Sequence, residues 1–410
     1  MHIREMSLEE YRNFEKKHIL RNFHQTIDYA LVKSEDGFDY EIIGYDDDGI
    51  KAASLILYKK IGGYYYGYAP RGFLLDYSNT ILLSNFTEEI KEYFLPKKFA
   101  FIKINPEIAI GQYNFLSQRI TYNNNYRILD NLKNAGYLKL ANNAYFESLL
   151  PRMNVIVNLD NFDEYNIKKN TRNKVRKAIR KGLILEKVDN FKLHIFYEMF
   201  KDKKDNDFYY YNTFYNVFAK NDNIDLILVK IDYKSFLINS QNAYNKELQR
   251  NNRLNNKLIS HNEPNVINAK MHSDIALLTY KNDINEASKY LNNHKETYVA
   301  GAMVIKKDNR VTFQFTAFDK NYGRFAPNYF LYYALLYYYK GNYKYADLNG
   351  ITADNSVNSP YRGLNRFKLG FKPSVYEYIG EFDLPIDDNA YNHLLKSGFL
   401  AKEFNKKKKL

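Results

Sequence analysis

The chain has 410 residues, enough for two or three domains and a sizeable apolar core. It contains no cysteine, which excludes disulfides, thiolate metal sites and cysteine nucleophiles, and its net charge of +13 favours polyanionic partners. The first residues lack the apolar stretch of a signal peptide, and the longest apolar run, 329–339, is too short to span a bilayer. These features predict a cytoplasmic protein.

The first half is predicted to contain a helix, three strands, a second helix and a fourth strand. A helix over 7–18 is indicated by Ser7 as its N-cap, by acidic residues in the first turn and by one apolar face. Alternating apolar residues and turn signals then predict strands over 41–44, 52–58 and 64–68, a helix over 80–94 and a buried strand over 100–104.

The same order of elements recurs in the second half. The patterns predict a helix over 189–201, strands over 225–230, 302–305 and 311–318, a helix over 327–340 and a strand over 345–348. A polar loop, 366–371, and a last strand, 375–382, follow. This repetition predicts a mixed α/β (α+β) chain built from two tandem acyltransferase-like units of the GNAT type.

Residues 234–297 interrupt the second unit. The segment has no glycine and a single proline, Pro264, with apolar residues at heptad-like spacing on both sides of it. It is therefore predicted to form an antiparallel helical hairpin, a coiled coil, inserted between two strands. The spaced residues are Leu237, Tyr244, Asn251 and Leu258 before the proline, and Leu277, Tyr280, Ile284, Ala287 and Leu291 after it.

These patterns divide the chain into four predicted parts. Residues 1–150 form the first GNAT-like unit, and 151–233 with 298–386 form the second. Residues 234–297 are the hairpin, and 387–410 form a C-terminal helix with a basic tail. The lysines at 406–409 are interpreted as a frayed basic tail; the alternative is contact with an anionic lipid surface at the inner face of the membrane.

A cluster of cations lies between the two units, at 168–181. On a helix, four of these cations share one face at i, i+4 spacing, where like charges destabilise the helix. A polyanionic partner explains why they are tolerated, and a solvated helix face is the alternative. The four are Lys168, Arg172, Arg176 and Arg180, with Ile167, Val175, Ala178 and Ile179 expected to anchor the helix.

Two loops, 69–73 and 322–327, stand where a GNAT enzyme holds the pyrophosphate of coenzyme A. Each loop has a single glycine and lacks the Gly-x-Gly spacing that lets a backbone wrap a diphosphate, which argues against this cofactor. The eight histidines are scattered, and no paired carboxylates stand out. We therefore predict neither a cofactor nor a metal.

Three motifs in the second half resemble those of the FemABX family of peptidoglycan aminoacyltransferases. They are Asp347-Leu-Asn-Gly-Ile351, Phe367-Lys-Leu-Gly-Phe371 and Glu377-Tyr-Ile-Gly-Glu-Phe-Asp-Leu-Pro-Ile386, in the family's order and spacing. Blocks 22–33 and 68–77 match too, so that the resemblance extends from about Phe23 to Ile386. The resemblance implies transfer of an amino acid from aminoacyl-tRNA to the stem-peptide amine of lipid II or UDP-MurNAc-pentapeptide.

The resemblance also implies roles for residues near the reacting ester. Phe367 and Lys368 correspond to the donor-side pair, and Lys368 is the candidate for stabilising the tetrahedral oxyanion; a plain surface lysine is the alternative. Asp76 is the candidate, by position, for the base that takes the proton of the attacking amine. A turn or cap residue is the alternative for Asp76, with hydroxyls of the substrate or the tRNA as the base.

On the acceptor side, Lys33 matches the family's phosphate-binding lysine, with an exposed lysine as the alternative. Arg71 and Gly72 lie in the block that lines the acceptor cleft of the family. Where some members supply an arginine for the phosphates, this chain has Tyr211 and Tyr215. The basic stripe described above corresponds to a tRNA-binding helix of the family.

Two other functions remain as alternatives. One is aminoacyl transfer from tRNA to a protein N-terminus, which uses a related fold. The other is a non-catalytic RNA-binding or scaffold protein, for which the basic helix and the hairpin would be the binding surfaces. The oligomeric state is monomer or dimer.

Overall fold

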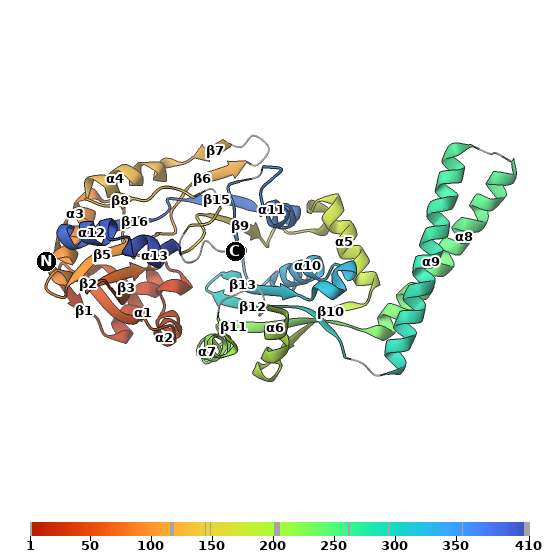
Figure 1. The fold of residues 1–410 in the computed structure, drawn as a ribbon, viewed down its shortest axis with the longest axis horizontal. Coiled ribbons are helices and arrows are strands. Elements are labelled where there is room, and N and C mark those ends of the chain that lie inside the picture. The colour runs from red at the N-terminus through yellow and green to blue at the C-terminus, as the bar shows by residue number, and fades with distance from the viewer. Residues whose placement is uncertain are drawn as a thin grey trace.

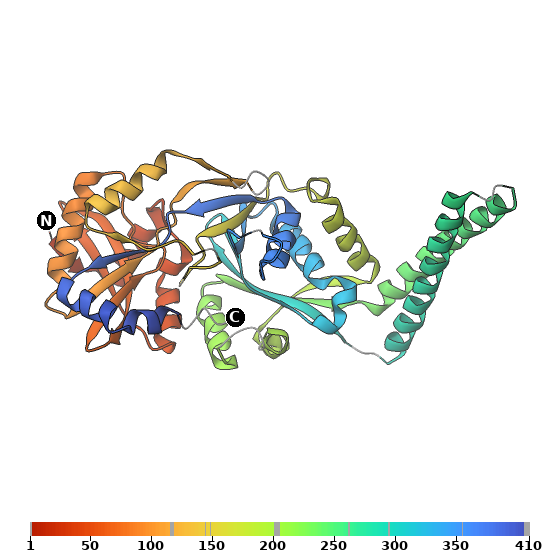
Figure 2. The ribbon, with the colours of Figure 1, turned by 45° about the horizontal axis from the view of Figure 1, so that its top comes forward.

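The computed structural model describes residues 2–114, 119–143, 145–147, 149–200, 206–260, 263–293, 296–354 and 356–405. Figure 1 shows an elongated molecule in which two sheets follow one another along the long axis and a two-helix arm projects beyond the second sheet. The turned view in Figure 2 keeps the same order. Both sheets contain parallel and antiparallel pairs, so the predicted mixed α/β fold is confirmed.

The first sheet has seven strands in the order β1-β2-β3-β4-β5-β16-β8, all antiparallel except for the pair β4 and β5. Its first helix begins as predicted, because the Ser7 side chain accepts a hydrogen bond from the backbone N–H of Glu10. The strands are β1 (His2–Glu5), β2 (Asp39–Asp46), β3 (Ile50–Ile61), β4 (Tyr64–Ala69), β5 (Phe99–Ile104), β8 (Leu138–Lys139) and β16 (Phe382–Pro385), and the accompanying helices are α1 (Leu8–Lys17), α2 (Ile27–Glu35), α3 (Thr80–Phe94) and α4 (Ile128–Asn134).

The second sheet has nine strands in the order β10-β11-β12-β13-β14-β9-β15-β6-β7. These are β6 (Ala109–Asn114), β7 (Arg119–Tyr122), β9 (Met153–Asn158), β10 (Leu183–Val188), β11 (Ile224–Ile231), β12 (Tyr298–Lys307), β13 (Arg310–Phe318), β14 (Tyr345–Ile351) and β15 (Ser374–Tyr378). The helices around it are α5 (Lys169–Arg180), α6 (Leu193–Phe200), α7 (Phe208–Ala219), α10 (Pro327–Tyr339) and α11 (Arg362–Lys368), and the chain ends with α12 (Asp388–Lys396) and α13 (Phe399–Asn405).

The predicted repetition of elements is present. Each half runs through helices, three antiparallel strands, a helix and a strand that pairs in parallel with the third strand: β2-β3-β4-α3-β5, then β11-β12-β13-α10-β14. The equivalent helices α2 and α7 contact each other. One apolar cluster joins the two halves, with Leu55 of β3 and Leu228 of β11 both fully buried in it. The two units therefore share a core.

The strands do not divide between the sheets at the predicted boundaries. β6 and β7 lie within residues 1–150 but belong to the second sheet, where Gln112 is paired with Tyr376 of β15. The predicted strand 375–382 is instead two strands, β15 in the second sheet and β16 in the first, where Leu384 is paired with Ile102. Gly380, between them, has a φ of +85°, which permits the chain to turn from one sheet to the other.

The inserted segment forms the predicted helical hairpin, α8 (Tyr233–Ser260) and α9 (Pro264–Asn292). The helices run antiparallel, since the rings of Tyr233 and Tyr290 lie 5.2 Å apart near the base and Asn251 donates to Ser273 Oγ over 3.1 Å further out. The base is part of the main core: Phe236 and Ala287 are fully buried there. Thus only the outer part of the hairpin projects as an arm.

Helix α5 carries the predicted basic stripe, with two differences. Lys168 is the N-cap residue and lies outside the helix, so the stripe on α5 consists of Arg172, Arg176 and Arg180. Ile179 was expected to anchor the helix but is 43% exposed, and Thr171 is buried in addition to Val175 and Ala178. The expectation for Ile179 is therefore wrong, because the helix packs through Thr171, Val175 and Ala178, which lie at i, i+4 and i+7.

The C-terminal helix is confirmed as α12 and α13, whereas the lysines at 406–409 lie outside the described residues. Over the ranges that the structure describes, no helix has both the length and the apolar character needed to cross a bilayer.

Candidate active site

The third and fourth strands of the second unit separate from each other. β13 and β14 pair only where they begin, from Arg310 opposite Tyr345 to Thr312 opposite Asp347. Beyond Thr312, β13 continues to Phe318, and over this part its described strand partner is β12 alone. In the first unit, the equivalent strands β4 and β5 stay paired as far as Ala69 and Ile104. Among the residues that the structure describes, the open strand pair belongs to the second unit, and side chains from both strands line the opening.

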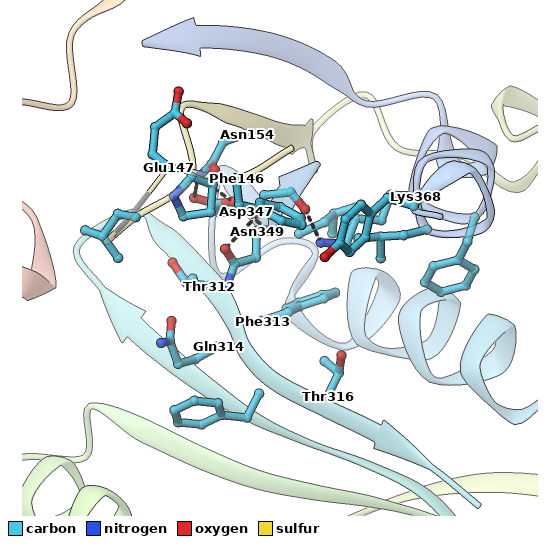
Figure 3. Close-up of a pocket in the computed structure, with 18 of the residues that line it drawn as sticks. Phe146, Glu147, Asn154, Thr312, Phe313, Gln314, Thr316, Asp347, Asn349 and Lys368 are labelled. Carbon is cyan, nitrogen blue, oxygen red and sulfur yellow. Dashed lines mark hydrogen bonds between the residues drawn. The ribbon is translucent and has the colours of Figure 1, made fainter. Parts of the chain in front are cut away.

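A cleft of about 1060 Å³ lies in this opening. Residues of both open strands line it (Figure 3), together with α10, α11, residues 143, 145–147 and 149–151, and three regions of the first unit. This volume is sufficient for a small molecule or one end of a larger substrate. The residues that matter below are Asn22, Arg71, Glu107, Asn154, Asp347, Asn349, Gly350, Phe367 and Lys368.

Lys368 and Phe367 both line the cleft, as their predicted role requires. The predicted loop over 366–371 is wrong, because Lys368 is the last residue of helix α11. This short helix is fixed to the end of β14 by the buried amide of Asn365, which bonds to both the N–H and the carbonyl of Thr352. Lys368 is 6% exposed, and its Nζ donates to the carbonyl oxygen of Gly350 over 2.7 Å.

Phe367 forms an aromatic wall beside Lys368. Its ring meets Tyr332 edge-on at 4.7 Å between centroids, and Tyr329 at 4.9 Å. Such contacts hold the ring, and with it the end of α11, in one orientation.

A carboxylate on β14, Asp347, and an amide on the neighbouring strand β9, Asn154, also line the cleft. Asp347 is 4% exposed; its Oδ1 accepts from the backbone N–H of Asn349 over 2.8 Å and its Oδ2 from Asn154 Nδ2 over 3.1 Å (Figure 3). The first contact exists because β14 bulges after Asp347 and Asn349 adopts a φ of +69°. Burial raises the pKa of Asp347, although the Arg310 guanidinium, 4.0 Å away, opposes the shift.

A second buried carboxylate, Glu107, closes the base of the cleft. It is paired with Arg310, accepts from the hydroxyl of Tyr378 over 3.0 Å and accepts from the amide of Asn22. Burial alone would raise the pKa of Glu107, but Arg310 and Arg71 hold it below its ordinary value. Glu107 is therefore ionised and fully engaged.

Neither Asp347 nor Glu107 was predicted as a site residue. Asp347 belongs to one of the family motifs, and its position in the sequence could have identified it as a site residue, because it is a carboxylate at the end of an otherwise apolar predicted strand. No sequence pattern could have identified Asn154 or Glu107, because their partners are distant in sequence. Asn154 is 193 residues from Asp347, and Glu107 is 203 residues from Arg310.

Of the acceptor-side residues, Arg71 lies in the cleft and Gly72 does not. Arg71 is buried, donates to the carbonyl of Pro151 over 2.9 Å and lies 5.0 Å above the ring of Tyr378. Gly72 is packed against Gln25: a Cβ at Gly72 would come within 2.8 Å of Gln25 Nε2. Its role is to let the chain turn closely past Gln25.

Lys33 and the tyrosines of α7 are not among the residues that line the cleft. Lys33 Nζ binds Asp36 over 2.7 Å and lies 5.5 Å from the ring centre of Tyr210. Burial alone would lower the pKa of Lys33, but the neighbouring tyrosines and Asp36 raise it, so the ammonium is charged. Tyr211 is buried 5.2 Å from the ring of Phe315, which lines the cleft, and Tyr215 is half-buried.

Asp76 is not among the residues that line the cleft. It is exposed in the turn before α3, where its carboxylate accepts from the N–H of Ser78 over 3.0 Å. Hydrogen bonds from Ser78 lower its pKa. The structure thus places Asp76 as the turn residue that was the alternative interpretation.

The arginines of the α5 stripe are partly engaged with their surroundings. Arg172 bonds to the carbonyl of Tyr165, Arg176 pairs with Glu164 over 3.4 Å, and Arg180 lies 5.1 Å from the ring centre of Tyr280. Helix α8 carries a second row of exposed cations at helical spacing, which was not predicted although the spacing is visible in the sequence: Lys246, Arg250, Arg253 and Lys257.

Within the described ranges, no group of histidine, aspartate and glutamate side chains is arranged to hold a metal ion.

Three comparisons place this geometry among known proteins. The FemAB family model matches residues 6–396. Lipid II:glycine glycyltransferases of Staphylococcus haemolyticus (strain JCSC1435) and Staphylococcus aureus (strain USA300) are each 26% identical to this chain, over 409 and 404 residues, covering 93% of the chain and 92% of each relative. A crystal structure of FemX has the same fold, with a TM-score of 0.72 and 23% identity, over 96% of this chain and 99% of that one.

Proposed function

Because this chain belongs to the FemAB family, we propose that it transfers an amino acid from an aminoacyl-tRNA to the stem-peptide amine of lipid II, and so builds a peptidoglycan bridge. The names of the relatives favour glycine as the amino acid and lipid II, rather than the UDP-linked precursor, as the acceptor. One observation carries the proposal: Phe367 and Lys368 of the family motif lie in a cleft formed by the open strand pair.

The donor is an ester and is therefore already activated. Transfer requires alignment of the two substrates and stabilisation of the tetrahedral intermediate, but no nucleophile of the protein. The cleft fits this requirement, since it offers a fixed cation at Lys368 and no cysteine. Coenzyme A is not needed.

In the proposed reaction, the acceptor amine attacks the ester carbonyl and forms the new C–N bond. The carbonyl oxygen becomes an oxyanion, which the Lys368 ammonium stabilises, and Gly350 keeps that ammonium in place. The ester C–O bond then breaks, and the ribose hydroxyl of the tRNA leaves with the proton that the amine has lost.

The tRNA itself needs a larger surface than the cleft. We assign its phosphates to the arginines of α5 and to the cation row on α8, both of which lie on the side of the molecule that carries the arm (Figure 1). The acceptor reaches the cleft from the first unit, past Arg71. With a lipid-linked acceptor, the enzyme works at the inner face of the membrane.

The direct test is to incubate the protein with glycyl-tRNA and lipid II and to weigh the product. We expect lipid II to gain one glycyl residue, and Lys368→Met to abolish most of this gain. A peptide with a free N-terminus serves as the competing acceptor. Glycylation of that peptide alone would replace the proposal with transfer to proteins, and tRNA binding without any product would leave an RNA-binding protein.

A further inference from the structure

Asp347 and Asn154 form a polar pair at the inner end of the cleft. The orientation of the Asn154 amide is fixed, because its Nδ2 has to face the acceptor oxygens of Asp347, at 3.1 Å and 3.4 Å. Its carbonyl oxygen therefore points away from Asp347. Asn154 is 5% exposed, and this Oδ1 has no hydrogen-bond donor among the residues that the structure describes. A buried acceptor without a donor is costly and indicates a missing group.

The charges around Asp347 also indicate that a group is missing at this position. The closest cation, Arg310, is 4.0 Å from Oδ2 and is already paired with Glu107. Arg71 also acts on the charge of Asp347 but donates to a backbone carbonyl, the hydroxyl of Tyr378 donates to Glu107, and the Glu107 carboxylate repels Asp347. Asp347 is thus a buried carboxylate without a full counter-charge, and burial raises its pKa.

We infer that Asp347 and Asn154 form a receptor for a primary ammonium group of a substrate. This inference rests on the proposed function and adds a binding site to it. An ammonium has three N–H donors and one positive charge, so that it satisfies the Asn154 carbonyl and the Asp347 carboxylate together. A hydroxyl or an amide N–H offers neither the charge nor enough donors.

Two ammonium groups enter the proposed reaction, and the receptor suits either of them. One is the α-ammonium of the aminoacyl donor, and the other is the side-chain ammonium of the stem peptide. The receptor and Lys368 are held by the same short stretch of β14, since Asp347 begins it and Gly350, which binds Lys368, ends it. An ammonium at the receptor therefore lies near the carbonyl that Lys368 polarises.

If the bound group is the acceptor ammonium, Asp347 accepts one proton from it before attack and then releases this proton to solvent, so that the carboxylate is restored. The amine loses its second proton as the C–N bond forms, and that proton passes to the departing ribose oxygen. If the bound group is the donor's α-ammonium, Asp347 positions the donor and excludes N-acylated aminoacyl groups.

Calorimetric titration with paired probes tests the receptor. The donor pair is glycyl-adenosine with a non-hydrolysable amide linkage and its N-acetylglycyl twin; the acceptor pair is a lysine-containing stem pentapeptide and its norleucine twin. For at least one pair, we expect the wild type to bind the ammonium probe about tenfold more tightly than the twin. The pair that shows this difference identifies the source of the ammonium.

The variants are Asp347→Asn and Asn154→Leu, with Asp354→Asn as the matched control outside the cleft. We expect Asp347→Asn to bind both probes of that pair equally, with unchanged affinity for the uncharged twin, and Asn154→Leu to lose part of the difference. Asp354→Asn should behave as the wild type. The inference is overturned if the wild type shows no difference with either pair, or if Asp347→Asn retains it.

Failure of the receptor and failure of the proposed function give different results. Glycylated lipid II without any probe discrimination overturns the receptor and leaves the function standing. Probe discrimination without a transfer product supports the receptor and overturns the function. Asn154→Leu provides a second route to the same answer if Asp347→Asn does not fold.

Discussion

Replacement of Lys368 by methionine separates its chemical role from its structural one. Methionine keeps most of the length and apolar packing of the side chain but removes the charge and the 2.7 Å bond to Gly350. Loss of such a charge-assisted hydrogen bond costs about 1.5–3 kcal/mol of stability, which is offset in part because the cost of burying the ammonium is removed with it. Loss of a cation aimed at an oxyanion typically costs about a hundredfold in turnover, or about 2.7 kcal/mol in the activation barrier.

We therefore expect Lys368→Met to melt only slightly below the wild type and to bind the acceptor with unchanged affinity, while turnover falls by about two orders of magnitude. The assay is single-turnover transfer from glycyl-tRNA to lipid II, with thermal melting in parallel. Lys372→Met is the matched control, because Lys372 is exposed four residues further along the chain. Turnover within about threefold of the wild type would refute the oxyanion role.

Three other predictions concern the remaining surfaces and the buried carboxylate. Arg176→Glu should raise the apparent KM for the charged tRNA several-fold and reduce the slope of its salt dependence by about one, whereas Lys16→Glu on the first unit should change neither. Replacing residues 245–279 by a short Gly/Ser turn should leave the protein folded, because Asp283 and the buried base of the hairpin are retained. The same variant should bind tRNA more weakly. Loss of the cooperative thermal melt would contradict a projecting arm. Because the pKa of Asp347 is raised in the folded protein, its ionisation destabilises the fold as the pH rises above 3.8, its pKa in the unfolded chain. Asp347→Asn should therefore increase the melting temperature at about pH 7, and increase it less at about pH 4.5. A decrease in melting temperature at neutral pH would contradict the burial argument.

Local patterns predicted those elements whose ends are set by nearby residues. The helix over 80–94 was predicted with its observed bounds, since Asn79 caps it through the N–H of Leu82 and its apolar face repeats at helical spacing. The prediction failed at α11, a seven-residue helix without a side-chain cap. Its stability comes from Asn365 bonding to Thr352, which no local pattern reveals.

Lys33 and Lys368 show the same difference between what the local sequence predicts and what only the tertiary structure determines. Lys33 and Lys368 were both identified by their place in motifs, but neither position says what surrounds the ammonium. Lys33 is held by Asp36 and by a tyrosine of α7, whereas Lys368 is turned into the cleft and fixed by Gly350. The difference depends on which helix faces which strand.

By itself, the sequence determined the order of elements, the duplication, the inserted hairpin and the family motifs, because periodicity, caps and turns act over a few residues. Only the tertiary structure decided where the strands of one half join the sheet of the other, and that β13 and β14 separate after Thr312. It alone brought Asn154 to Asp347 across 193 residues. Such contacts depend on register between distant strands, which is fixed by the packing of the whole core.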